Sequence, residues 1–277
     1  MKISLLSICA RHPAATAHAP DAVRGVSFNV ESGEHIAIIG PSGAGKTTIL
    51  HLLACALQPS AGSLLLEAVN PWEQTSSVLQ TLRGKLFLAP QVPPLPPRQR
   101  VVTAVLAGRL PQQSLWASLR SLFYPTGSAM AEAALARFDL SDKLFERVDR
   151  LSGGERQRVG LARILASNAK LLLVDEPLSA LDPLRSEQAI ETLTHIATEQ
   201  GATLVATLHH VEMALKAFPR IIGMRDGEVV FDLPSAKVTP QHLQDLYAQH
   251  LHELTGPAPD ADSLLAAPAL PAVMHCR

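Results

Sequence analysis

The stretch that decides the fold is Gly40-Pro41-Ser42-Gly43-Ala44-Gly45-Lys46-Thr47-Thr48. It follows the apolar run Ile36–Ile39 and precedes Ile49–Ala54, which is typical of the start of a helix. A strand, a glycine-rich turn, a Lys-Thr pair and a helix are the order that a phosphate-binding loop requires. Glycines let successive backbone N–H groups surround an anion, and the N-terminus of the helix adds partial positive charge. The stretch therefore predicts a nucleotide site, with Lys46 at the β- and γ-phosphates and the Thr47 hydroxyl on Mg²⁺.

Composition bounds the classes of protein that this chain can belong to. Its 277 residues, 47% of them hydrophobic, are enough for one large domain or a domain with an insert. A formal net charge of −1 gives no sign of the basic surface typical of nucleic-acid-binding proteins. Charged residues make up only 18%, which fits a protein that buries surface against partners. Cys9, Cys55 and Cys276 lack metal-ligand spacing, so we expect thiols in a reducing compartment.

The beginning of the chain superficially resembles a signal peptide. Its apolar part is short, however, and Arg11-His12-Pro13 follows in place of a small-residue cleavage site. No apolar run approaches the roughly 20 residues needed to cross a bilayer. We therefore interpret Ile3–Ile8 as the first strand of the domain and expect the protein to stay in the cytoplasm.

Alternating strand and helix patterns predict an α/β core with a mostly parallel sheet. The expected strands are Ile3–Ile8 and Val26–Val30, both as edge strands, then His35–Ile39, Ser63–Leu66, Leu171–Val174, Thr203–Leu208, Arg220–Met224 and its hairpin partner Glu228–Phe231. The later helices are expected at Ala129–Phe138, Arg156–Ala166, Pro183–Gln200, Val211–Phe218 and about Pro240–Leu254.

A change of composition near Pro90 marks an insert. The proline-rich segment Gln91–Pro97 fits neither a helix interior nor a central strand, because each proline removes a donor and fixes φ. Helical spacing then runs from Val101 to about Arg147. We predict a helical subdomain at about residues 92–165 inside a domain of residues 1–254. The Pro/Ala-rich remainder, 255–277, is predicted to be disordered.

An acidic pair, Asp175 and Glu176, closes the predicted strand Leu171–Val174. Ligands of α/β sheets bind at the carboxyl ends of such strands. Asp175 can orient Mg²⁺ through its water shell, and Glu176 can accept a proton from the water that attacks the γ-phosphate. Such a pair can also merely cap a helix. Together with an upstream phosphate loop, it predicts nucleotide hydrolysis.

A second glycine-containing turn opens a helix at Leu151-Ser152-Gly153-Gly154-Glu155-Arg156-Gln157-Arg158 and is a second anion site by the same physics. This octet resembles the signature motif of ABC transporter ATPases, and the resemblance spans roughly residues 1–235. It implies a P-loop NTPase core with a mostly parallel sheet, an antiparallel β subdomain and an inserted α-helical subdomain. It also implies ATP and Mg²⁺ as cofactors.

Other motifs of that family follow in order. Gln91 matches the glutamine that touches Mg²⁺ and the attacking water. His209, directly after a strand, matches the histidine at the γ-phosphate better than His210 does. Asp182, in Ser179-Ala180-Leu181-Asp182, matches an aspartate that bridges two ATPase subunits. One departure concerns adenine: the family usually stacks a Tyr on the base, and the matching residue here is His12, which offers less area.

The resemblance also implies partners. In the family, ATP lies between the phosphate loop of one subunit and the signature motif of another. Ser152, Gly153 and Gly154 would therefore complete the site of a second copy in a head-to-tail C₂ dimer. The dimer would drive transmembrane permease subunits, and indirectly a substrate-binding protein, from the cytoplasmic face of the inner membrane.

The helical insert indicates the kind of transporter. Val101–Leu110 and Leu115–Phe123 resemble the ATPase subunits of phosphonate importers, as do Thr207–Glu212 and Arg220–Asp232. An importer for another small solute remains open. A soluble ABC-type ATPase that acts on nucleic acid or ribosomes usually carries coiled-coil arms or two cassettes, which the sequence does not show. A simple P-loop kinase would have no use for the signature octet.

Overall fold

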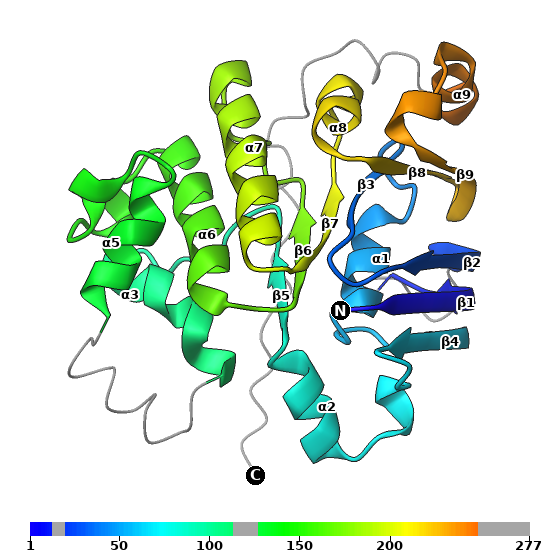
Figure 1. Cartoon of the computed structure of the whole chain (residues 1–277), viewed down its shortest axis with the longest axis horizontal. Helices are drawn as coiled ribbons and strands as arrows, with labels where there is room; N and C mark the ends of the chain where they lie inside the picture. Colours follow the sequence, from blue (N-terminus) through cyan, green and yellow to red (C-terminus); the bar gives the residue numbers. More distant parts are fainter. Residues whose placement is uncertain (13–19, 113–126, 249–277) are drawn as a thin grey trace.

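A six-stranded sheet forms the centre of the fold (Figure 1). The computed structural model describes residues 1–12, 20–112 and 127–248. The strands, in spatial order, are β5 (Leu86–Ala89), β6 (Leu171–Asp175), β7 (Thr203–Thr207), β3 (His35–Ile39), β8 (Arg220–Arg225) and β9 (Glu228–Pro234). All neighbours pair in parallel except β8 and β9, which form the antiparallel hairpin expected across the Asp-Gly turn. The predicted mostly parallel sheet is confirmed.

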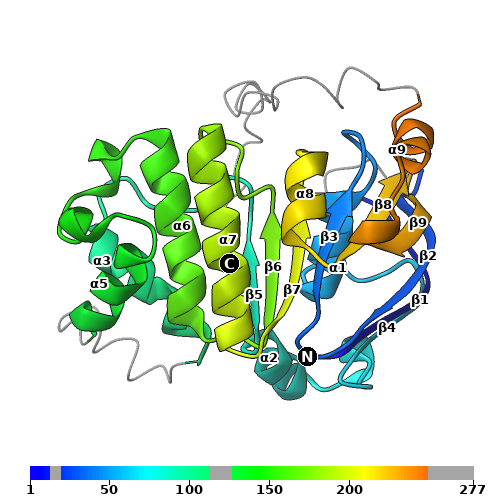
Figure 2. The ribbon, with the colours of Figure 1, turned by 45° about the horizontal axis from the view of Figure 1, so that its top comes forward.

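Both faces of this sheet are buried. Ile36 and Ile38 of β3 pack with α1 (Lys46–Leu53), whereas Ala37 and Ile39 pack into the core beneath the helices of the other face. Those helices are α6 (Gly153–Ser167), α7 (Pro183–Glu199) and α8 (Val211–Ala217), which lie side by side in Figure 2. A parallel strand buried on both faces reads as an unbroken apolar run, which is why β3 and β6 could be predicted closely from the sequence.

A second, three-stranded antiparallel sheet lies on the far side of α1 (Figure 1). Its order is β2 (Val23–Val30), β1 (Ile3–Ala10) and β4 (Ala61–Leu66). The prediction that β1 is an edge strand is therefore wrong, since β1 pairs with β4 on its other side, Ile3 opposite Leu66. Local sequence patterns show a strand but not its partner, and Leu66 lies 63 residues after Ile3.

Most of the secondary structure described between β5 and β6 is helical. The helices there include α3 (Val101–Leu106) and α5 (Ser128–Ala136), and both pack against α6. Strand β5 itself was not expected, because it has only four residues and runs straight into Pro90. The other helices of the described residues are short: η1 (Pro71–Glu73), α2 (Ser76–Arg83), η2 (Ala107–Gln112), η3 (Ser141–Lys143), η4 (Val148–Arg150), η5 (Ser235–Lys237) and α9 (Pro240–Leu246). The exact limits of the helical subdomain stay a prediction, and the segments 115–123 and 255–277 lie outside the described residues.

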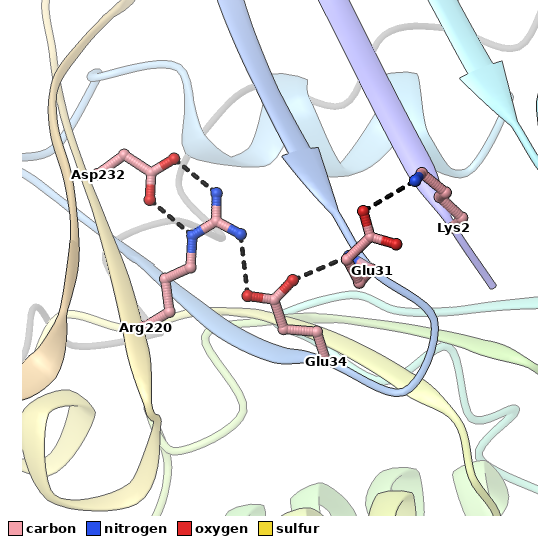
Figure 3. Close-up of polar contacts among 5 residues, drawn as sticks. All are labelled: Lys2, Glu31, Glu34, Arg220 and Asp232. Carbon is pink, nitrogen blue, oxygen red and sulfur yellow. Dashed lines mark hydrogen bonds and ion pairs between the residues drawn. The ribbon is translucent and has the colours of Figure 1, made fainter.

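A cluster of charges joins the turn before β3 to β8 and β9 (Figure 3). The Arg220 guanidinium donates two hydrogen bonds of 2.7 Å to Asp232 and a third of 2.9 Å to Glu34. Glu34 in turn accepts from the backbone N–H of Glu31, whose carboxylate pairs with Lys2 at 2.8 Å. Three-quarters of the Arg220 side chain is shielded from solvent, whereas the Lys2–Glu31 pair is exposed.

We expect Arg220→Met to lower the free energy of unfolding by about 1–3 kcal/mol, because it leaves two half-buried carboxylates without their cation. Urea titration followed by circular dichroism measures the change. Lys2→Met, which removes only the exposed pair, should cost at most about 1 kcal/mol. Equal losses in the two variants would contradict the importance assigned to burial.

Candidate functional site

The carboxyl ends of β3, β6 and β7 open onto one cavity of about 450 Å³. Most of the residues predicted for the nucleotide site line it. They are His12, Ser42, Gly43, Ala44, Gly45, Lys46, Thr47, Thr48, Gln91, Glu176 and His209, joined by Ala22. The structure thus brings together residues from six separate parts of the sequence.

The shape of the phosphate loop depends on glycine. Gly40 has φ +151°, and a Cβ there would lie 1.9 Å from the carbonyl oxygen of Met224. Gly45 has φ +94°, and its Cβ would lie 2.4 Å from the carbonyl oxygen of Ala22. No side chain fits at either distance, so the backbone can take this course only with glycine.

We expect Gly45→Ala to destabilise the protein far more than Gly33→Ala. Both glycines have positive φ, which costs alanine about 1–2 kcal/mol, but a Cβ on Gly33 meets nothing within 4 Å. The overlap with Ala22 at Gly45 should add about 1–3 kcal/mol. Thermal unfolding of the two variants compares them directly. Equal shifts in Tm would show that the loop relaxes away from the contact.

Lys46 lies along the loop that precedes it. Its Nζ donates hydrogen bonds to the carbonyl oxygens of Gly40, at 2.8 Å, and Pro41, at 3.1 Å, and the residue is only 5% exposed. Both of these acceptors are neutral carbonyl groups, whereas a buried ammonium is stabilised most by a negative charge. A phosphate in the loop would offer Lys46 stronger, charge-assisted hydrogen bonds than these carbonyls do.

Glu176 occupies the centre of a hydrogen-bonded group. Its Oε2 accepts from Gln91 Nε2 at 2.9 Å, and its Oε1 lies 2.5 Å from His209 Nε2. Its backbone has φ +44°, in the left-handed region, and its N–H donates to Thr207 Oγ1 at 3.0 Å. The three residues predicted to act at the γ-phosphate, Gln91, Glu176 and His209, are therefore in direct contact.

Asp175 is buried beside this group. Burial raises the pKa of its carboxyl, and hydrogen bonds from Thr207 and Thr47 oppose the rise. The bond from Thr207 Oγ1 to Asp175 Oδ1 measures 2.6 Å. Thr47, Asp175 and the amide oxygen of Gln91 are all oxygen donors, which is the ligand type that Mg²⁺ prefers. These residues fit that ion.

Thr207 is a site residue that the sequence reasoning missed. It bonds to both members of the acidic pair, through Asp175 Oδ1 and the N–H of Glu176. The signal was a hydroxyl at the carboxyl end of an otherwise apolar stretch, two residues before His209. Such a residue can orient carboxylates without contacting a ligand itself.

The signature turn and Asp182 lie outside the cavity of this chain. Ser152 is the N-cap of α6: its Oγ accepts from the N–H of Glu155 at 3.2 Å, and Glu155 accepts from the N–H of Ser152 in return. Asp182 caps α7 by accepting from the N–H of Arg185 at 3.0 Å. Within one chain, Ser152, Gly153, Gly154 and Asp182 are therefore not brought to the phosphate loop.

Known proteins that resemble this chain in sequence are ATP-binding proteins of transporters. Residues 23–179 match the ABC transporter family. The chain is 72% identical, over the full length of both proteins, to "Phosphonates import ATP-binding protein PhnC" of Polaromonas sp. (strain JS666). It is 54% identical to a protein with that name, numbered 1, from Pseudomonas syringae pv. tomato, over 90% of this chain and 92% of that protein.

Solved structures agree with this match. The dimeric ATP-binding cassette MJ0796 in a post-hydrolysis state, bound to ADP and Pi, is 27% identical with a TM-score of 0.72, over 84% of this chain and 98% of that one. The fold is also that of cbiO1 from Clostridium perfringens (TM-score 0.70, 21% identity, 90% and 95% of the two chains). None of the helices in the described segments is long and apolar enough to cross a membrane. By its family match, its full-length relatives and its fold, this chain belongs to the ABC transporter family of ATP-binding proteins.

Proposed function

We propose that this chain is the ATP-binding and ATP-hydrolysing subunit of an importer for phosphonates or related phosphorus compounds. The observation that carries the ATPase assignment is the contact of Glu176 with Gln91 and His209 at the mouth of the phosphate loop. The solute assignment rests on the full-length relatives named for phosphonate import. No side chain of this subunit needs to touch the solute.

Each residue of the site would have a separate role in ATP binding or hydrolysis. The loop from Gly40 to Thr48 would surround the phosphates with N–H groups, and Lys46 would turn from its carbonyl partners to the β- and γ-phosphates. Thr47 and Asp175 would hold Mg²⁺, which neutralises charge on the phosphates. Glu176 would accept the proton of the attacking water, and His209 would contact the γ-phosphate.

A second copy would complete the site. Ser152, Gly153 and Gly154 lie at the start of α6 and outside the cavity, so in one chain they leave the exposed side of the phosphates uncovered. A head-to-tail dimer would place them over the partner's phosphate loop, with Asp182 at the boundary. The pair would work at the cytoplasmic face of the inner membrane against permease subunits, which receive solute from a substrate-binding protein.

His12 is the candidate for the adenine, since it lines the same cavity from the end of β1. We expect His12→Tyr to preserve or tighten ATP binding, because tyrosine offers a larger stacking surface worth about 0.5–1.5 kcal/mol. Isothermal titration with ATP measures the dissociation constant, and titration with pyrophosphate, which has no base, is the control. A clear loss of ATP affinity would mean that His12 does not face the base.

The solute assignment is tested on the assembled transporter. The chain is purified with its permease, reconstituted with the substrate-binding protein, and assayed for ATP hydrolysis with methylphosphonate, phosphite, phosphate or an amino acid. We expect stimulation by methylphosphonate or phosphite. Stimulation by the amino acid alone would favour an importer for another small solute and contradict the proposal.

A further inference from the structure

The backbone of Glu176 adopts a conformation that must be imposed on it. A non-glycine residue with φ +44° is unusual. In addition, Pro177 follows Glu176, and a proline favours an extended backbone for the residue before it. Such a conformation persists only where surrounding contacts determine it. On the N-terminal side the contact is Thr207, which accepts from the N–H of Glu176.

The contact on the C-terminal side comes from helix α6. Gln157 donates through Nε2 to the carbonyl oxygen of Pro177 at 2.9 Å, and its side chain is buried, with the residue only 5% exposed. This hydrogen bond ties α6 to the backbone of Pro177, the residue that follows Glu176. The same helix begins at the signature turn.

One turn further along, the same face of α6 supports the loop that carries Gln91. A Cβ on Gly160 would lie 2.6 Å from Pro93 Cγ, so Pro93 rests directly on the helix backbone. Gln157 and Gly160 are three residues apart and therefore adjacent on the helix surface. Helix α6 thus contacts the backbone of Pro177, next to Glu176, and also the loop of Gln91, whose amide bonds to the Glu176 carboxylate.

We propose that Gln157 is a positioning residue for hydrolysis, which sets the carboxylate of Glu176 through the Pro177 carbonyl. The inference rests on the proposed ATPase function. Because Gln157 and the signature turn share one helix, a shift of that helix when a second copy engages would move the Pro177 peptide and the Gln91 loop together. The same movement of α6 would then complete the partner's nucleotide site and align Glu176, the proton acceptor of this chain's own site.

The test is Gln157→Met, which keeps the length of the side chain and removes its donor. We expect kcat for ATP hydrolysis to fall roughly tenfold to hundredfold, because small displacements of a catalytic group have effects of this size. The dissociation constant for ATP should change by less than about twofold, since the phosphate loop is untouched. The matched control is Ser167→Ala, which removes another buried hydrogen bond to a backbone carbonyl on α6, that of Ile164. It should leave kcat unchanged.

Three further measurements keep the result decisive. Gly160→Ala, which displaces Pro93, should also lower kcat at unchanged ATP affinity. In a Glu176→Gln background, Gln157→Met should cause no further loss in single-turnover hydrolysis. Size-exclusion chromatography should show that this double variant still forms a dimer when ATP is added. Additive losses, loss of the dimer, or an equal fall in kcat for Ser167→Ala would each overturn the positioning role. If Glu176→Gln itself hydrolyses ATP at the wild-type rate, Glu176 is not the base and the positioning role fails with it. The proposed function fails separately, if the wild-type protein does not hydrolyse ATP.

Discussion

Glu176→Gln is expected to reduce steady-state ATP hydrolysis by about 10²–10⁴-fold, the range for loss of a general base. The amide keeps the size of the side chain and cannot accept the proton of the attacking water. ATP affinity should be retained, because neither Lys46 nor the glycine-rich loop is changed. Phosphate release measures the rate, and equilibrium titration measures the affinity.

The same variant should accumulate as a dimer when ATP is added, because the nucleotide that joins the two copies is no longer cleaved. Multi-angle light scattering with and without ATP gives the mass. Glu191→Gln, on the exposed face of α7, is the matched control and should hydrolyse ATP normally. Full turnover by Glu176→Gln would remove Glu176 from its role.

Lys46→Ala should weaken ATP binding by roughly 10- to 150-fold, which corresponds to a charged hydrogen bond of about 1.5–3 kcal/mol. The lost group is the buried ammonium that now bonds to Gly40 and Pro41. Isothermal titration measures the dissociation constant. Lys237→Ala, which removes an exposed ammonium in η5, controls for the overall change in charge. Unchanged affinity in Lys46→Ala would contradict the phosphate-loop assignment.

The sequence was most informative where local chemistry leaves few choices. The apolar run of β3, the glycines that need positive φ and the Lys-Thr pair can form only one kind of loop, and β3 lies at the predicted residues His35–Ile39. The order of the later motifs also predicted which distant residues would meet, since parallel strands end at one edge of the sheet. Gln91, Glu176 and His209 do meet there.

What the sequence could not predict depends on long-range contacts. The partner of β1 is β4, and the four residues of β5 show no pattern of their own. The left-handed backbone of Glu176 is set by Thr207 and by Gln157, which come from different elements. A glutamine inside a signature motif gives no sign, read alone, that its amide reaches the Pro177 carbonyl.

The claim that ATP is held between two copies can be tested by mixing two inactive variants. Lys46→Ala damages the phosphate loop, and Gly153→Asp places a negative charge on the signature turn, where a Cβ meets nothing within 4 Å in the single chain. A mixed dimer has both lesions in one site and none in the other. We expect the equimolar mixture to recover about a quarter of the wild-type hydrolysis rate, because half of the dimers are mixed and each has one intact site. A mixture as inactive as its two components would contradict the shared site.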